Sequence, residues 1–366
     1  MAEASPTVGA KSSATHMSRS RSGGGRSART VYFDVLNIFA CFGVVCMHFN
    51  SLTHAYSPTP AWHEALFVDC IFYWAVPIFF MLTGANLMRY RERYSTKEFF
   101  KKRFMRTLIP FLAWNFILLA WKVTTAQMEA PEGKLTLINM VFNNQIEPIY
   151  WFFIPLFAVY LCMPLLSHLA DERKTLAYGA IVAIVLNIIC PNLAPLVGIT
   201  WNVDMTMTLL SGYLIYAALG YLLKEWNPPF SLRVIIYVLG LVGTFVRYFG
   251  TAVSSDAAGQ MVHYMWGYTN IPCFVESIAV FVLIKNISWD SLFKSERSKR
   301  ALAKISGCSF GIYLTHLIAF YYGVKITGMY GDRLEWRTLG PVIAYLVCLI
   351  ITYIGKRIPG IKLLFP

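Results

Sequence analysis

Apolar segments long enough to cross a lipid bilayer recur along this chain of 366 residues. A spanning helix needs about 20 mainly apolar residues, because lipid offers no hydrogen-bond partner to exposed backbone groups. The chain is 57% hydrophobic and only 14% charged, which is too apolar for a soluble domain. We therefore predict an all-α, polytopic membrane protein with about ten transmembrane helices. The predicted spans cover residues 31–52, 65–88, 105–124, 149–167, 175–190, 205–223, 233–250, 264–284, 304–323 and 338–355.

The distribution of positive charge predicts how these spans are oriented. Cytoplasmic loops of membrane proteins are enriched in Lys and Arg. If the N-terminus is cytoplasmic, 26 of the 32 Lys and Arg residues lie on that side. We therefore expect a multi-pass protein of the cell membrane with both termini in the cytoplasm. This topology also explains the net charge of +13 without a nucleic-acid partner.

The chain is predicted to have three regions. Residues 1–29 are rich in Ser, Gly and Arg and lack apolar periodicity, which is typical of a disordered basic cytoplasmic tail. Residues 30–356 hold the ten predicted helices. Residues 357–366 are predicted to be a short cytoplasmic tail.

Polar residues lie on one face of the first predicted span. At about 100° per residue, Asp34, Asn37, Cys41 and His48 share a stripe, with Asn37 and His48 roughly 16 Å apart along the axis. Ionisable groups within a membrane are costly unless they are partnered or hydrated, so the stripe is a candidate functional site. A structural hydrogen-bonding contact between helices is the alternative. The eight cysteines lie in or at the ends of spans without metal-ligand spacing, so we expect no metal.

Other candidate residues lie at the ends of spans. Arg103 and Arg106 stand three residues apart where the third span begins, so an α-helix would place them on one face. Trp151 opens the fourth span, where an aromatic anchor at the outer interface is the ordinary role. An entrance near the outer ends of the first two spans is predicted to include His54, His63, Glu64 and Asp69.

Candidate residues also lie deep within spans. Glu276 is a carboxylate inside the eighth span and a candidate partner for His48 or His316. Tyr313 and His316 are about one turn apart near the middle of the ninth span. A purely structural hydrogen bond is the alternative for this last pair.

Four stretches of the chain resemble the acyltransferase-3 family of integral-membrane acyltransferases. They are the first span with its Asp and His, FFKKRFMRTLIPF, YWFFIPLFAVYLCMPLL and SFGIYLTH. Each stretch is short, but the four stand in the family's order, and the resemblance covers residues 30–356. It implies transfer of an acyl group, usually acetyl, from cytoplasmic acyl-CoA to a hydroxyl of an exported or cell-surface acceptor. That acceptor is expected to be a carbohydrate or a lipid-linked molecule, and a homodimer is left open.

The resemblance also implies roles for individual residues. His48 matches the family's catalytic histidine, and Asn37 stands where many members have Arg. Transfer from a thioester to an alcohol needs a base, and imidazole is suited to that role near neutral pH. Arg103 and Arg106 are expected to bind the phosphates of the donor. The residues expected to orient the acceptor or the histidine are Trp151, Glu276, Tyr313 and His316.

Two further expectations concern the first span and the end of the chain. Asp34 lies about 21 Å from His48 along a straight helix, so we expect it to contact Asn37 or a basic residue of another span. Because the chain ends soon after the last span, we expect direct transfer without an added extracytoplasmic domain. A transporter or flippase, with Asp34, Glu276 and His48 as a proton relay, is the competing hypothesis.

Overall fold

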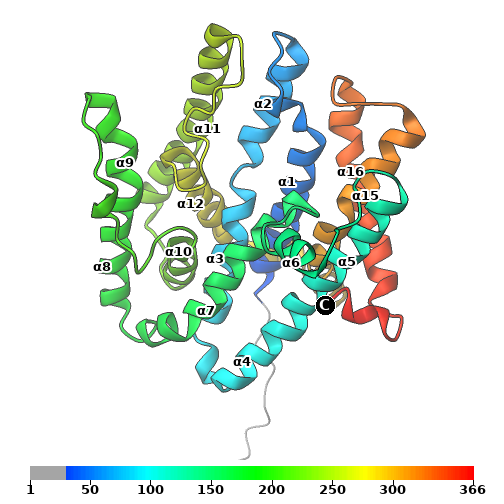
Figure 1. The fold of residues 1–366 in the computed structure, drawn as a ribbon. Helices are drawn as coiled ribbons and strands as arrows, with labels where there is room; N and C mark the ends of the chain where they lie inside the picture. The colour runs from blue at the N-terminus through cyan, green and yellow to red at the C-terminus, as the bar shows by residue number, and fades with distance from the viewer. Residues whose placement is uncertain (1–29) are drawn as a thin grey trace, which may run out of the picture. The chain divides into compact units, whose positions relative to one another are not determined.

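The computed structural model describes residues 30–366, so the tail predicted at residues 1–29 lies outside the described residues. All regular secondary structure within residues 30–366 is helical, as Figure 1 shows. The principal helices are α1 (Val31–Phe49), α2 (Pro60–Phe72), α3 (Ala75–Leu87), α4 (Thr96–Arg103), α5 (Ile109–Thr124), α7 (Phe153–Leu169), α8 (Arg173–Ile184), α10 (Leu214–Glu225), α11 (Phe230–Ala258), α12 (Ile271–Asn286), α14 (Glu296–Ser306), α15 (Ser309–Thr327) and α16 (Leu334–Gly355). Shorter helices are α6 (Lys134–Phe142), α9 (Cys190–Leu193) and α13 (Trp289–Leu292).

The long helices confirm a polytopic membrane protein. Seven helical segments within the described residues are long and apolar enough to span a membrane, or eight if α14 and α15, bent by 52°, form one span. The sixth and eighth predicted spans contain α10 and α12, which have 12 and 16 residues. In Figure 1, α10 is seen nearly end-on, whereas α8 and α11 are seen from the side. The count of ten spans and the cytoplasmic termini stay predictions.

Helix α1 is surrounded by other helices. It packs against α2, α3, α12, α14, α15 and α16. Gly43 allows one of these contacts, because a Cβ there would lie 2.9 Å from Cδ1 of Phe72. By contrast, α8, α11 and α16 expose many apolar side chains, such as Ile181, Val253 and Ile350. The polar stripe of the first span therefore lies inside the protein, and the apolar outer faces suit lipid.

Helices α3 and α10 cross at very close range. A Cβ on Gly84 would lie 1.8 Å from the carbonyl oxygen of Ala217, and one on Gly220 would lie 2.0 Å from that of Met81. Small residues allow such close backbone approach between membrane helices. The two glycines therefore allow the backbones of α3 and α10 to lie in direct contact.

A helix break places Tyr73 beside the candidate site. The chain is helical up to Phe72 and again from Ala75. Pro77 has no N–H, so the carbonyl oxygen of Tyr73 lacks its usual partner four residues later. The thiol of Cys273 donates to that oxygen, with the sulfur 3.8 Å away. The break between α2 and α3 thus follows from the sequence and is supported by α12.

The last residues of the chain are packed against the helices. The indole N–H of Trp114 in α5 donates to the carbonyl oxygen of Leu364 at 3.0 Å. The side chain of Phe365 is buried, with its ring centroid 5.5 Å from that of Trp114. Residues 357–366 therefore do not extend freely from α16. Their predicted cytoplasmic location stays a prediction.

Candidate active site

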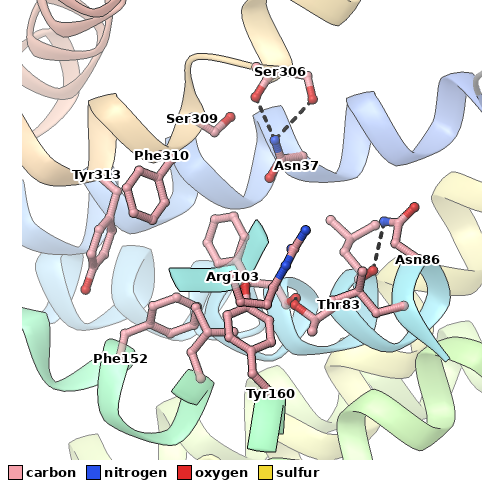
Figure 2. A pocket seen from close by; sticks show the side chains of 15 residues that line it. Asn37, Thr83, Asn86, Arg103, Phe152, Tyr160, Ser306, Ser309, Phe310 and Tyr313 are labelled. Carbon is pink, nitrogen blue, oxygen red and sulfur yellow. Dashed lines mark hydrogen bonds between the residues drawn. The ribbon is translucent and has the colours of Figure 1, made fainter. Parts of the chain in front are cut away.

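One cavity, the Arg103 cavity, has a volume of about 410 Å³. Its walls come from α1, α3, α4, α7, α15, the turn before α7 and the junction between α14 and α15. Figure 2 shows Arg103 and Asn37 on opposite sides of this space, with Thr83 and Asn86 along α3. The cavity thus combines one cationic side chain with several neutral polar groups. It lies at the end of α1 that holds Asn37.

The second cavity, the His48 cavity, has a volume of about 210 Å³. His48, near the end of α1, lines it together with Asp69 and a group of aromatic side chains. The aromatic residues that line this cavity are Tyr73, Trp151, Phe152, Trp266, Tyr268 and Tyr313. Such walls suit a small ligand that presents flat faces and a few polar groups.

The two cavities share part of their walls. Phe152 and Tyr313 line both of them. The hydroxyl of Tyr313 donates to the carbonyl oxygen of Ile149, and the hydroxyl of Tyr150 donates to that of Leu314 at 3.0 Å. These two hydrogen bonds hold α15 against the turn before α7 (Pro148–Phe152). A thin, anchored aromatic partition therefore separates the Arg103 cavity from the His48 cavity.

Two histidines face each other next to this partition. The ring centroids of His48 and His316 are 5.1 Å apart. Nδ1 of His316 lies 2.7 Å from the carbonyl oxygen of Tyr313 and 3.2 Å from that of Ile312. Because a carbonyl oxygen only accepts, Nδ1 carries the hydrogen and Nε2 of the neutral ring is an acceptor. This Nε2 is buried and has no hydrogen-bond partner among residues 30–366.

His54 also lines the His48 cavity and belongs to the turn that follows α1. Loss of solvent and the nearby imidazole of His263 lower the pKa of His54. This imidazole is therefore mainly neutral at pH 7, and it can both donate and accept a hydrogen bond there.

Arg103 and Arg106 do not share the cavity that the sequence led us to expect. Arg103 lines it, and its guanidinium carbon lies 5.5 Å from the ring centroid of Tyr160, whereas Arg106 is exposed and lines neither cavity. The expectation of a common α-helical face was wrong because residues Phe104–Leu108 form a π-helical turn. Pro110 leaves the carbonyl of Arg106 without its α-helical partner, which favours this wider turn.

The polar stripe of α1 is divided between different surroundings. The amide of Asn37 donates to the carbonyl and hydroxyl oxygens of Ser306, at 2.8 and 3.1 Å. Asp34 is buried and lines neither cavity. The thiol of Cys41 is directed at the carbonyl oxygen of Ser309, 3.4 Å away. Asn37 and Cys41 therefore bind α1 to the α14–α15 junction, and His48 alone of the stripe lines its cavity.

Glu276 and Trp151 lie in different surroundings. Glu276 accepts a hydrogen bond from Thr244 at 2.8 Å and lines neither cavity, so its role in orienting His48 or His316 stays a prediction. Trp151 is partly buried in the wall of the His48 cavity, with its ring stacked at 5.4 Å on Tyr268. It is therefore a wall residue rather than an anchor that faces lipid.

Several residues of the site were not found from the sequence. Tyr73, Phe152, Trp266 and Tyr268 look like ordinary aromatic residues of spans and loops, and no local pattern distinguishes them. Arg247 carried a usable signal, because a cation inside an apolar segment is expensive and is often functional. Its side chain is 1% exposed and packs behind Tyr73.

Comparison with known proteins identifies the family. The acyltransferase-3 family model, described as an acyltransferase domain, matches residues 30–356. No curated protein and no solved structure gave a match. The match covers nearly the whole chain and includes every residue that lines the two cavities. The chain therefore belongs to the acyltransferase-3 family and is a membrane acyltransferase.

Proposed function

We propose that this enzyme transfers an acyl group, typically acetyl, from cytoplasmic acyl-CoA to a hydroxyl of an exported or cell-surface acceptor of carbohydrate type. The donor enters the Arg103 cavity and the acceptor enters the His48 cavity. The observation that carries this proposal is the shared wall at Phe152 and Tyr313. The donor and the acceptor approach from opposite ends of α1, and acyl transfer requires their reacting atoms to meet. Two binding cavities that share a wall satisfy this requirement.

The Arg103 cavity suits the donor because of its charge and its position. CoA carries phosphates, which form strong hydrogen bonds with guanidinium groups. Asn37 cannot supply the positive charge that many family members have at its position, and Arg103 lines the same cavity. Arg103 belongs to a basic segment, residues 89–106, and a second basic segment, residues 294–304, lies just before Ser306. We assign Arg103 the role of holding the donor, with this end facing the cytoplasm.

His48 acts as the general base in the proposed reaction. Its imidazole takes the proton from the acceptor hydroxyl while that oxygen attacks the carbonyl carbon of the thioester. The bond from this carbon to sulfur then breaks, and the leaving thiolate takes up the proton from the imidazolium. Nε2 of His316 can accept a hydrogen bond from the ring of His48 and favour its charged form. His316 is thus a positioning residue.

The donor site is tested by comparing the two arginines. We expect Arg103→Gln to raise the KM for acetyl-CoA by about tenfold, since charge-assisted hydrogen bonds contribute about 1.5–3 kcal/mol. Arg106→Gln removes the same charge three residues away and is the matched control, with an expected change below about twofold. The measurement is acetyl-CoA turnover by purified protein in detergent. Equal effects of the two substitutions would contradict the assignment.

The competing function, a transporter with a proton relay, needs Asp34, Glu276 and His48 to act together. His48 lines its cavity, but Asp34 and Glu276 do not. The carboxylate of Glu276 accepts instead from Thr244, a residue of α11. No observation favours this relay, so we retain the acyltransferase as the single proposed function.

A further inference from the structure

A cluster of buried charges lies behind the wall of the His48 cavity. Asp69 on α2, Arg247 on α11 and Glu276 on α12 are 4%, 1% and 5% exposed. Both carboxylates lie within electrostatic range of the guanidinium of Arg247. Buried charges are costly unless they are compensated, so a cluster of this kind calls for a functional explanation. The proposed transfer reaction does not by itself use Arg247 or Asp69.

Arg247 supports the aromatic wall of the cavity from behind. Its guanidinium carbon lies 3.7 Å from the ring centroid of Tyr73, and its Nη2 donates to the carbonyl oxygen of Met265 at 3.4 Å. Tyr73 in turn stacks on Tyr268, with centroids 4.5 Å apart and rings inclined by 17°. The cation therefore backs two aromatic rings that line the cavity.

Asp69 belongs to the cluster and also to the cavity. It lines the His48 cavity, and its Oδ2 is buried without a hydrogen-bond partner among the described residues. A buried acceptor left unpaired costs free energy, whereas a carboxylate can accept several hydrogen bonds. A ligand hydroxyl in this cavity would supply the missing donor. Arg247 lies near Asp69 and compensates its negative charge. The ligand therefore need not carry a positive charge.

We propose that Asp69 positions the acyl acceptor by accepting a hydrogen bond from a second hydroxyl of a single polyhydroxylated ring that lies against the aromatic wall of the His48 cavity. Arg247 is the positioning residue that holds Asp69 and Tyr73 in place. The volume of 210 Å³ is below the roughly 300 Å³ at which pockets for drug-sized ligands begin, so one ring enters rather than an oligosaccharide. The inference rests on the proposed transfer reaction and names how that reaction selects its acceptor.

The test compares acceptors that differ in their second hydroxyl. Acetyl transfer from acetyl-CoA is measured to a panel of methyl hexopyranosides and to cyclohexanol, which has one hydroxyl, alongside hydrolysis without an acceptor. We expect Asp69→Asn to raise the KM for the best glycoside by about tenfold, with kcat, cyclohexanol transfer and hydrolysis little changed. Asp256→Asn is the matched control, because Asp256 is half-exposed on α11, bonded to Tyr56, and lines neither cavity.

Arg247 is tested by the same assay. Arg247→Gln is expected to raise the glycoside KM as Asp69→Asn does, and Arg247→Lys to restore part of the affinity. The double variant Asp69→Asn/Arg247→Gln should raise the glycoside KM by less than the product of the two single factors, because both residues act on the same hydrogen bond to the acceptor. A general loss of folding would instead lower hydrolysis and cyclohexanol transfer together with glycoside transfer, and would overturn the positioning role.

Other outcomes separate this inference from the proposed function. A wild-type protein that neither hydrolyses acetyl-CoA nor transfers acetyl would remove the proposed function and the inference with it. Active protein with an unchanged glycoside KM in Asp69→Asn would overturn the inference alone. Hydrolysis without transfer to any glycoside of the panel would overturn the inference and count against the carbohydrate-type acceptor, while leaving the use of acetyl-CoA in place. Preference for glucosamine over its neutral analogues, lost in Asp69→Asn, would make Asp69 a counter-ion and overturn the neutral-ring assignment.

Discussion

Replacing His48 with alanine is expected to lower kcat for acetyl transfer by about 10²–10⁴, the usual contribution of general acid–base catalysis. The change removes the imidazole that lies between the acceptor cavity and His316. Binding of acetyl-CoA should persist, because the Arg103 cavity does not include His48. Transfer of labelled acetyl by purified protein measures kcat, and equilibrium binding of labelled acetyl-CoA measures the second part of this prediction.

The control for His48 is a histidine outside both cavities. His168 is exposed in the last turn of α7, so His168→Ala should leave kcat within about twofold of wild type. His48→Ala protein that is folded, binds acetyl-CoA and transfers acetyl at the wild-type rate would refute the base assignment. Loss of acetyl-CoA binding in His48→Ala would contradict the division into two cavities.

Adding a methyl group to Gly84 is expected to have the largest effect on the fold. The new Cβ would lie 1.8 Å from the carbonyl oxygen of Ala217, which belongs to a helix backbone and cannot rotate away. Helices α3 and α10 must then separate, at a cost of about 3 kcal/mol or more, the upper end of overpacking effects. We expect Gly84→Ala to lower the Tm in detergent by several degrees and to reduce the yield of folded protein.

The matched control for Gly84 is Gly133, just before α6. No atom lies within 4 Å of a Cβ built on Gly133, and its φ of −170° is an extended conformation that alanine adopts. Gly133→Ala should therefore change stability by less than about 0.5 kcal/mol. If Gly84→Ala melts at the wild-type temperature, the close crossing of α3 and α10 is wrong.

The sequence predicted the polytopic class because apolar length and composition act locally. Each apolar segment must bury its backbone polar groups within one helix, so a spanning helix can be read from about 20 residues. The choice of His48 as a candidate catalytic residue also came from local information, since an ionisable group in such a helix is unusual. Predictions about helix faces were weaker. The expected pairing of Arg103 with Arg106 failed at the π-helical turn before Pro110.

Contacts between distant segments could not be derived from one sequence. The bonds between Asn37 and Ser306 join residues 269 positions apart, and the facing rings of His48 and His316 depend on the packing of α15 against α1. Glu276 had a clear signal as a buried carboxylate, yet only the structure could show that its partner is Thr244 rather than a histidine. Aromatic residues such as Tyr268 carry no signal until their neighbours are known.

The sequence by itself determined the membrane class, the family resemblance and the choice of His48 as a candidate, because each depends on residue type and spacing within one segment. The tertiary structure decided that Arg103 rather than Arg106 lines a cavity, that Phe152 and Tyr313 divide two cavities, and that Asp69 lines the one with His48. The physical reason is that helix packing sets these relations. Whether two faces meet depends on close contacts such as that of Gly84 with Ala217, which bring together side chains far apart in the chain.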